Sequence, residues 1–382
     1  MIIDAKKTIN SNNSQRIEFA HALRGLAAFS VLISHFCGVF WLSPGAVAAI
    51  LNVEAPTVVP PAFILPLHFS PYLNYGSFGV AVFFLISGFV IPFSLKKLSA
   101  PAFLIARAFR IYPVYIFSLC VSLGVVWLLG RYGGGKGVSY DTYHILAQAS
   151  LTRGWFWIPS IDGVSWTLEI EIVFYLIAAI FSPFLLRSNY ASQLLVGYAI
   201  ATPLLCIIFI NALNGASGIT QTVLLYAAYA LPFTVFMFIG TLFHLVSVNK
   251  ITPSQLIFGV IACVWGFSVG AAVHPGLKSF SVSSYFIALG VFCSFWWTRE
   301  SFKSNAILDR MADISYPLYA VHAVLGYSIM HVLSGFLVSP LSIIFCAALI
   351  VIASSALIHF VIERPTMYFG KKVAENFNKM IV

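Results

Sequence analysis

The chain has 382 residues, of which 60% are hydrophobic, 16% are aromatic and only 9% are charged. Because a soluble domain averages about 25% charged residues, this composition excludes a soluble globular protein and predicts a polytopic membrane protein. The net charge of +9 does not indicate nucleic-acid binding, since the basic residues gather at one side of the predicted membrane spans.

Apolar runs along the chain predict an all-α fold, a membrane bundle of about ten transmembrane helices. Each run is long enough to cross a hydrocarbon core of about 30 Å. The predicted spans cover residues 18–42, 76–95, 109–130, 164–186, 193–211, 222–244, 254–273, 282–298, 313–333 and 339–361. Eight or twelve spans would be compatible with the same charge asymmetry, whereas an odd number would not.

Lysine and arginine residues predict the orientation of these spans. With the N-terminus in the cytoplasm, only four of the 21 Lys and Arg residues fall on the outer side: Arg131, Lys136, Arg153 and Lys278. The positive-inside rule therefore predicts that both termini are cytoplasmic. Residues 1–16 are expected to form a mobile cytoplasmic tail, residues 17–365 the membrane domain, and residues 366–382 a basic cytoplasmic tail.

The first span carries two ionisable residues, Arg24 and His35, eleven positions apart. At 100° per residue this spacing is three turns plus about 20°, so both side chains leave the same helix face, about 16 Å apart along the axis. An ionisable group near the bilayer midplane is a functional candidate, because it is costly to leave unpaired in lipid. The structural alternative is that His35 hydrogen-bonds a neighbouring helix and only supports packing.

The second and third spans each carry a polar feature. Gly79 and Gly88 permit close helix contact, and Ser87 can hydrogen-bond across helices, a pattern that favours packing over catalysis. Arg107 and Arg110 are three residues apart and share a helix face, so both guanidiniums can bind one polyanion. Equally, two cations at a cytoplasmic helix end are a common topological signal.

The fourth span begins with two carboxylates, Glu169 and Glu171, whose side chains point about 200° apart. A single polar cavity is therefore not expected to hold both. Glu171 shares its face with Thr167 and Tyr175 and lies deeper in the bilayer than Ser165, which makes it the preferred functional acid. Its structural alternative is a buried interhelical hydrogen bond.

In the ninth span, Ser315, Tyr319 and His322 form one polar stripe at helical spacing. A structural histidine is as compatible with this stripe as a catalytic one. The six cysteines stand singly in apolar runs, and no group of His, Asp or Glu has metal-ligand spacing, so we expect no metal site.

These segments together resemble the acyltransferase 3 family of integral membrane acyltransferases, from about Arg16 to Pro365. The residues that carry the resemblance are Arg24-Gly25-Leu26-Ala27 with His35, Gly79-Val80 with Phe83-Phe84 and Ser87-Gly88-Phe89, Arg107 and Arg110 with Pro113, Ser165-Trp166-Thr167-Leu168 with Glu171 and Phe174-Tyr175, Ile314-Ser315-Tyr316 with Tyr319 and His322, and Glu363-Arg364-Pro365. One departure is Ala81, where the family often has Asp after Gly-Val.

The resemblance implies transfer of an acyl group, usually acetyl, from cytoplasmic acyl-CoA to a hydroxyl of a sugar in a surface polysaccharide or lipid-linked glycan. It implies a bacterial inner membrane as the location, with membrane lipid, glycan acceptor and acyl-CoA as partners and no nucleic acid. Arg24, Arg107 and Arg110 would contact the phosphates of acyl-CoA.

In this scheme His35 would act as general base or accept the acyl group first. Glu171 would orient His35 or the acceptor. The supporting or substrate-contacting residues would be Ser87, Trp166, Tyr316 and His322.

Two other classes of function compete with the enzyme. In a secondary transporter of a glycan or lipid precursor, His35, Glu171 and His322 would form a proton relay. The two halves of the chain show no evident repeat, however, and the arginines gather at one face instead of a midplane site. The third hypothesis is a non-enzymatic membrane partner in polysaccharide assembly.

Overall fold

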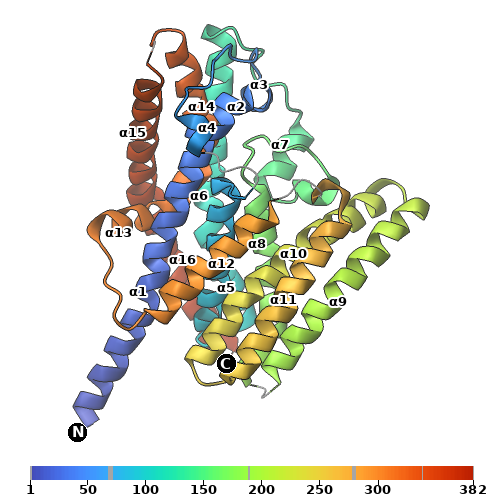
Figure 1. Ribbon diagram of the computed structural model, residues 1–382, viewed down its shortest axis with the longest axis vertical. Coiled ribbons are helices and arrows are strands. Elements are labelled where there is room, and N and C mark those ends of the chain that lie inside the picture. The colour runs from blue at the N-terminus through green and yellow to red at the C-terminus, as the bar shows by residue number, and fades with distance from the viewer. Residues whose placement is uncertain (1, 68–71, 188–189, 278–280, 338, 382) are drawn as a thin grey trace. The chain divides into compact units, whose positions relative to one another are not determined.

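The computed structural model describes residues 2–67, 72–187, 190–277, 281–337 and 339–381, and every regular element in these ranges is a helix (Figure 1). Lys278, one of the four basic residues predicted on the outer side, lies outside the described residues. The all-helical fold predicted for a membrane bundle is confirmed.

Each of the ten predicted spans contains a helix of at least 16 residues. Eight helical segments of the described residues are long and apolar enough to cross a membrane: Glu18–Leu42, Tyr75–Leu95, Ala100–Tyr132, Trp166–Leu186, Ala191–Gly215, Gly218–Ser247, Pro253–Val273 and Pro340–Ile381. The other two predicted spans correspond to α12 (Val282–Trp297), which has only 16 residues, and to α14 (Ser315–Ser334), which is more polar. The number of ten spans therefore stays a prediction.

The helices in these spans have the following bounds: α1 (Ile2–Ser34), α2 (Phe40–Leu42), α5 (Tyr75–Leu95), α6 (Ala100–Tyr132), α8 (Trp166–Arg187), α9 (Ala191–Ala212), α10 (Gly218–Ser247), α11 (Pro253–Val273) and α15 (Pro340–Ile358). Shorter or flanking helices are α3 (Pro44–Leu51), α4 (Ile64–Leu67), α7 (Thr142–Ala149), α13 (Ala306–Asp313) and α16 (Arg364–Ile381). Two single π-helical turns, η1 (His35–Val39) and η5 (His359–Glu363), and three short 3₁₀ turns, η2 (Arg153–Phe156), η3 (Leu213–Gly215) and η4 (Pro275–Leu277), complete the list.

The chain forms two compact units. The first unit comprises residues 1–86, 121–138 and 281–359, and the second comprises residues 87–120, 139–280 and 360–382. In the first unit, α1 packs against α13 and α14, and α14 packs against α15. Gly79 of α5 allows a close approach to α1, because a Cβ at this position would lie only 2.7 Å from the Ala27 carbonyl oxygen.

In the second unit, α9, α10 and α11 lie side by side (Figure 1), and α8 packs against α9 and α10. The C-terminal half of α5 contacts α10 so closely that a Cβ at Gly88 would overlap the Met237 carbonyl group. At the same place, the Thr241 hydroxyl donates to the Gly88 carbonyl oxygen at 2.9 Å. The predicted role of Gly79 and Gly88 in close helix packing is confirmed.

The structure adds detail at three predicted boundaries. Residues 2–16, expected as a mobile tail, are the first turns of α1, and residues 366–381, expected as a basic tail, belong to the amphipathic helix α16. The assignment of both segments as cytoplasmic tails stays a prediction. Asn378 of α16 accepts from the Ser99 backbone N–H at 2.7 Å. Helix α6 begins at Ala100, nine residues before the predicted span, because its apolar residues continue on both sides of Arg107.

Candidate active site

His35 lies at the start of a π-helical turn, His35–Val39, which interrupts the first membrane helix. Its Nδ1 is 2.5 Å from the Tyr327 hydroxyl oxygen. The ring of His322 meets the ring of His35 edge-on, with centroids 4.5 Å apart and planes at 81°. Since π turns inside α-helices are frequent at functional sites, this turn and the two α14 side chains mark His35 as a functional candidate.

His322 is held by its own helix. Its Nδ1 lies 2.9 Å from the Tyr319 carbonyl oxygen and 3.1 Å from that of Leu318. A carbonyl oxygen only accepts, so Nδ1 carries a proton, and in a neutral ring the lone pair is then on Nε2. The structure therefore brings the two predicted histidines together in the first unit and fixes the orientation of one of them.

The remaining predicted residues of the first unit lie on the same two helices. Arg24 is half-buried in α1, three turns before His35, and Tyr316 is half-buried in the first turn of α14. Their predicted roles in donor and substrate binding stay predictions.

Glu171 of α8 forms a second polar cluster, within the second unit. Its Oε1 accepts from the Tyr175 hydroxyl at 2.5 Å and from the Ser87 hydroxyl of α5 at 2.8 Å. The predicted contact between Glu171 and Tyr175 is confirmed, whereas Thr167 donates to the Val164 carbonyl oxygen at 3.1 Å. Ser87 thus bonds the carboxylate across helices, in addition to lying in a packed segment.

Arg107 adjoins this cluster. Its Nη2 donates to the Ser94 hydroxyl at 2.8 Å, and its guanidinium lies 5.8 Å from the ring centroid of Tyr175 and 5.3 Å from that of Phe103. Arg110 is half-buried and makes no hydrogen bond or ion pair with a described residue. The two arginines are therefore unequal: Arg107 is held by the protein, and Arg110 keeps its donors available.

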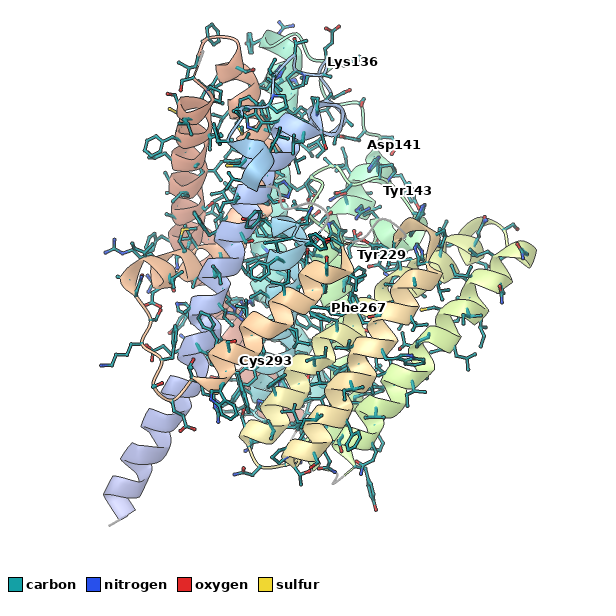
Figure 2. The ribbon with its side chains drawn as sticks, viewed as in Figure 1. Lys136, Asp141, Tyr143, Tyr229, Phe267 and Cys293 are labelled. Carbon is teal, nitrogen blue, oxygen red and sulfur yellow. The ribbon has the colours of Figure 1, made fainter. Side chains whose placement is uncertain are left out.

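A third polar cluster, not predicted from the sequence, is built around a buried ion pair in the second unit. The Nε of Arg153 lies 3.1 Å from Oε1 of Glu169, whose side chain is only 1% exposed. The pair opens into a cavity of about 260 Å³. Four aromatic side chains line it, those of Trp157, Trp166, Tyr226 and Tyr229, the last of which is labelled on α10 in Figure 2.

The two neighbouring glutamates therefore belong to different clusters, as their opposite directions on the helix predicted. Glu169 faces Arg153, and Glu171 faces Ser87 and Tyr175. Two residues in the sequence could have indicated this cluster: Glu169, a carboxylate within a predicted span, and Arg153, an isolated arginine on the outer side. Arg153 was used only to predict the orientation of the spans.

A buried network fixes the loop before α8. Gln148 donates from Nε2 to the Ser165 hydroxyl at 2.8 Å and to the Tyr115 hydroxyl at 2.6 Å. Asp162 accepts from the backbone N–H groups of Val164 and Ser165 at 3.0 and 2.9 Å, which satisfies donors of the loop residues directly before α8. This network holds Trp166 and Glu169 in place at the cavity.

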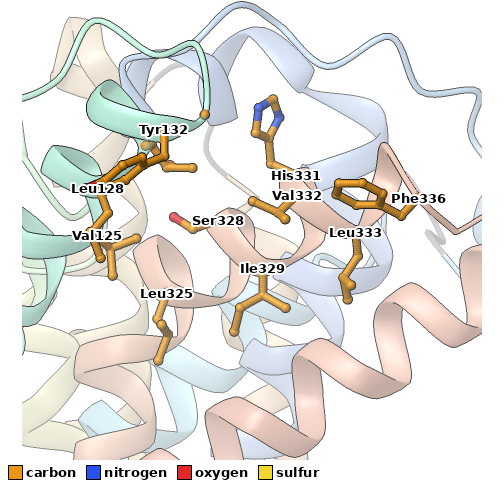
Figure 3. A pocket seen from close by; sticks show the side chains of 12 residues that line it. Val125, Leu128, Tyr132, Leu325, Ser328, Ile329, His331, Val332, Leu333 and Phe336 are labelled. Carbon is orange, nitrogen blue, oxygen red and sulfur yellow. The ribbon is translucent and has the colours of Figure 1, made fainter.

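A larger cavity of about 630 Å³ lies in the first unit, between the C-terminal end of α6 and α14 (Figure 3). Its described lining is mostly apolar and includes no carboxylate, and the Ser328 hydroxyl is engaged with the Val324 carbonyl oxygen at 2.7 Å. It offers no acid–base pair. Among the described residues, no group of three or more His, Cys, Asp or Glu could hold a metal ion.

Comparison with known proteins decides the family. A family model described as "Acyltransferase domain", that of the acyltransferase 3 family, matches residues 17–360. The chain belongs to this family. It is a membrane acyltransferase, and the resemblance seen in the sequence is confirmed.

Of two similar proteins, one is named as an acyltransferase. The chain is 23% identical to Acyltransferase MdmB of Streptomyces mycarofaciens over 315 residues, which cover 76% of this chain and 81% of that protein. It is 33% identical to Nodulation protein 10 of Rhizobium leguminosarum bv. viciae over 123 residues, 27% of this chain. The second match spans only 32% of that relative's length. No solved structure matches the chain.

Proposed function

We propose that this membrane acyltransferase moves an acyl group, in the simplest case acetyl, from cytoplasmic acyl-CoA to a sugar hydroxyl of a surface polysaccharide or lipid-linked glycan. It would do so in a bacterial inner membrane, with both termini in the cytoplasm. The observation that carries the proposal is the position of His35, at a π-helical turn and in contact with Tyr327 and His322.

His35 supplies the proton transfer that the reaction needs. When Nδ1 donates to the Tyr327 hydroxyl oxygen, the neutral ring carries its lone pair on Nε2. Nε2 then accepts the proton of the sugar hydroxyl while that oxygen attacks the thioester carbonyl carbon. The carbon–sulfur bond breaks, and the proton passes to the CoA thiolate. If the imidazole accepts the acyl group first, the same nitrogen is the nucleophile.

The arginines bind the donor in this proposal. Arg110 makes no hydrogen bond or ion pair with a described residue, so its guanidinium can take a phosphate in a bidentate contact. Arg107 is held by Ser94 and adjoins Tyr175, so it contributes charge from a fixed position. Arg24 adds a further cation for the diphosphate, and Glu171, fixed by Ser87 and Tyr175, orients the acceptor hydroxyl.

Two measurements test the proposal. Mass spectrometry of surface glycans and lipids should show an acetylated species in cells that contain the protein and none in cells that lack it. Purified protein in proteoliposomes should release CoA from acetyl-CoA when that glycan is supplied. Movement of an unmodified glycan or lipid precursor without CoA release would instead establish the transporter.

A further inference from the structure

We propose that the cavity beside α8 is an acceptor subsite that holds a single uncharged sugar ring. We call it the aromatic pocket, and its defining residues are Arg153, Trp157, Trp166, Glu169, Tyr226 and Tyr229. The assignment rests on the proposed function for the identity of the acceptor, but the chemistry of the pocket supports it independently.

The size of the pocket limits its ligand. Its volume is about 260 Å³, slightly below the range of about 300–1,000 Å³ typical of drug-sized ligands. The loop before α8 forms one side, and it is fixed by the buried Gln148–Ser165 hydrogen bond of 2.8 Å. A space of this size and rigidity fits one ring of a glycan and excludes an extended chain.

The aromatic side chains provide flat apolar walls. Tyr229 stands nearly perpendicular to Trp157, at 86° with centroids 6.1 Å apart, and at 67° to Trp166 with centroids 6.3 Å apart. Tyr226 and Tyr229 are nearly parallel, at 29°. A sugar ring has apolar C–H faces and hydroxyl groups at its edge, so it matches aromatic walls that carry polar groups beside them.

Two buried polar groups in the pocket have unused hydrogen-bonding capacity. The Tyr226 hydroxyl has no hydrogen-bond partner among the described residues, and the Glu169 carboxylate, which is paired with Arg153 through Oε1, can accept further hydrogen bonds. The two residues are 1% and 2% exposed. Buried polar groups normally have partners, since leaving them unsatisfied is costly. A ligand with several hydroxyl groups would supply donors to Glu169 and a partner for Tyr226.

The charge of the pocket selects against the donor. Arg153 is already engaged, by Glu169 at 3.1 Å and by the Ile158 carbonyl oxygen at 2.9 Å. The ion pair is neutral overall, and its carboxylate would repel a phosphate group. The pocket therefore suits an uncharged polyol and not the phosphates of acyl-CoA.

Two conservative variants test the subsite. Tyr226→Phe removes only the hydroxyl, and Glu169→Gln removes the negative charge that pairs with Arg153 and replaces one accepting oxygen with a donating amide group. With the acetylated glycan found by mass spectrometry as acceptor, each should raise the KM for that glycan about five- to hundredfold, as expected for losing one or two hydrogen bonds. The KM for acetyl-CoA should stay within twofold. The matched control is Tyr143→Phe, a residue outside the pocket whose side chain is 55% exposed (Figure 2).

A binding assay separates failure of the subsite from failure of the proposed function. Methyl glycosides of glucose, galactose, mannose and N-acetylglucosamine, each without acetyl-CoA, should change the tryptophan fluorescence of the wild type at millimolar concentration. The change for at least one glycoside should be lost in both Tyr226→Phe and Glu169→Gln. An unchanged acceptor KM in the folded Tyr226→Phe variant, or glycoside binding that survives in both variants, would overturn the assignment, whatever the activity of the wild type.

Discussion

His35 and Tyr327 are joined by a contact of 2.5 Å between Nδ1 and the hydroxyl oxygen, and their rings are stacked with centroids 5.7 Å apart. A partner at Nδ1 fixes the rotation of the imidazole, and when Nδ1 donates to the hydroxyl oxygen the lone pair of the neutral ring is on Nε2. In enzymes that use histidine as a base, a third group has this orienting role. In the proposed mechanism, Tyr327 is therefore a positioning residue for His35, although no pattern in the sequence singled it out.

The first prediction concerns His35. Because Gln keeps hydrogen bonding but cannot exchange a proton near neutral pH, His35→Gln should lower the rate of acyl transfer by about 10²–10⁴-fold while acetyl-CoA binding stays nearly intact. CoA release by reconstituted protein measures the rate, and gel filtration checks the fold. A folded Gln variant with most of its activity would show that His35 is structural.

The second prediction tests whether Tyr327 positions the imidazole of His35. Tyr327→Phe removes the contact to Nδ1 and keeps the ring, so kcat should fall by about three- to tenfold, corresponding to one hydrogen bond of about 0.5–1.5 kcal/mol. The pH profile of kcat should shift, because the protonation of the imidazole depends on its partner. If Tyr327 only fills space, kcat and its pH profile will both match those of the wild type.

The third prediction distinguishes the two arginines. Arg110→Gln should raise the dissociation constant of acetyl-CoA about 10- to 100-fold, since a charge-assisted phosphate contact contributes about 1.5–3 kcal/mol. It should change the melting temperature little. Arg107→Gln should weaken binding and also lower the melting temperature, because it breaks the contacts with Ser94 and Tyr175.

Ser94→Ala is the matched control for the arginine series. It removes the 2.8 Å hydrogen bond to Arg107 without removing a charge. We expect a modest loss of stability and a smaller change in acetyl-CoA affinity than in Arg107→Gln. Isothermal titration and thermal melting of the three purified variants give both quantities, and equal affinity in Arg110→Gln and wild type would remove Arg110 from the donor site.

Helical spacing predicted the contacts that lie within one helix, but not those that depend on loops. Glu171 and Tyr175 are four residues apart on α8 and meet as expected. The pairing of Arg153 with Glu169 depends on the path of the loop between α7 and α8. That path is set by buried hydrogen bonds, such as those of Gln148, which leave no periodic pattern in the sequence.

Two features of the helices were also not predicted from the sequence. The π-helical turn at His35 changes the local hydrogen bonding without a Pro, and the single Gly38 within it does not distinguish a π turn from a continuous α-helix. The early start of α6 was missed because Arg107 and Arg110 were interpreted as the end of a span. In the structure, the guanidinium of Arg107 is half-buried against aromatic rings, so the helix continues through it.

The fourth prediction tests the orientation. Tyr132 and Met380 are 80% and 84% exposed, so cysteines placed there are accessible to solvent on their own side of the membrane. Cys120 is an exposed native cysteine, so it is first replaced by Ala. In this background, Tyr132→Cys should react with an impermeant maleimide in intact cells, and Met380→Cys should react only after the cells are opened. Labelling of Met380→Cys in intact cells would contradict a cytoplasmic C-terminus.

The fifth prediction concerns acid stability and His274, which follows α11 directly. His274 is fully buried, with its ring against those of Trp157 and Tyr229 at centroid distances of 5.8 and 5.5 Å. The Gly276 N–H donates to its Nδ1 at 3.1 Å. Burial lowers the pKa of His274 below its ordinary value of 6.5, because the surroundings disfavour the charged ring.

The sign of the effect follows from this shift. The unfolded chain binds the proton more tightly than the folded one, so the contribution of His274 to stability is present above pH 6.5 and is lost as the pH falls below it. His274→Phe fits the same aromatic surroundings and cannot be protonated. At pH 7.5 it should be less stable than the wild type by about 0.5–1.5 kcal/mol, the value of the lost hydrogen bond. Between pH 7.5 and 5.5, however, its melting temperature should fall less than that of the wild type in the same detergent. An equal fall in both proteins would show that other groups determine the acid sensitivity.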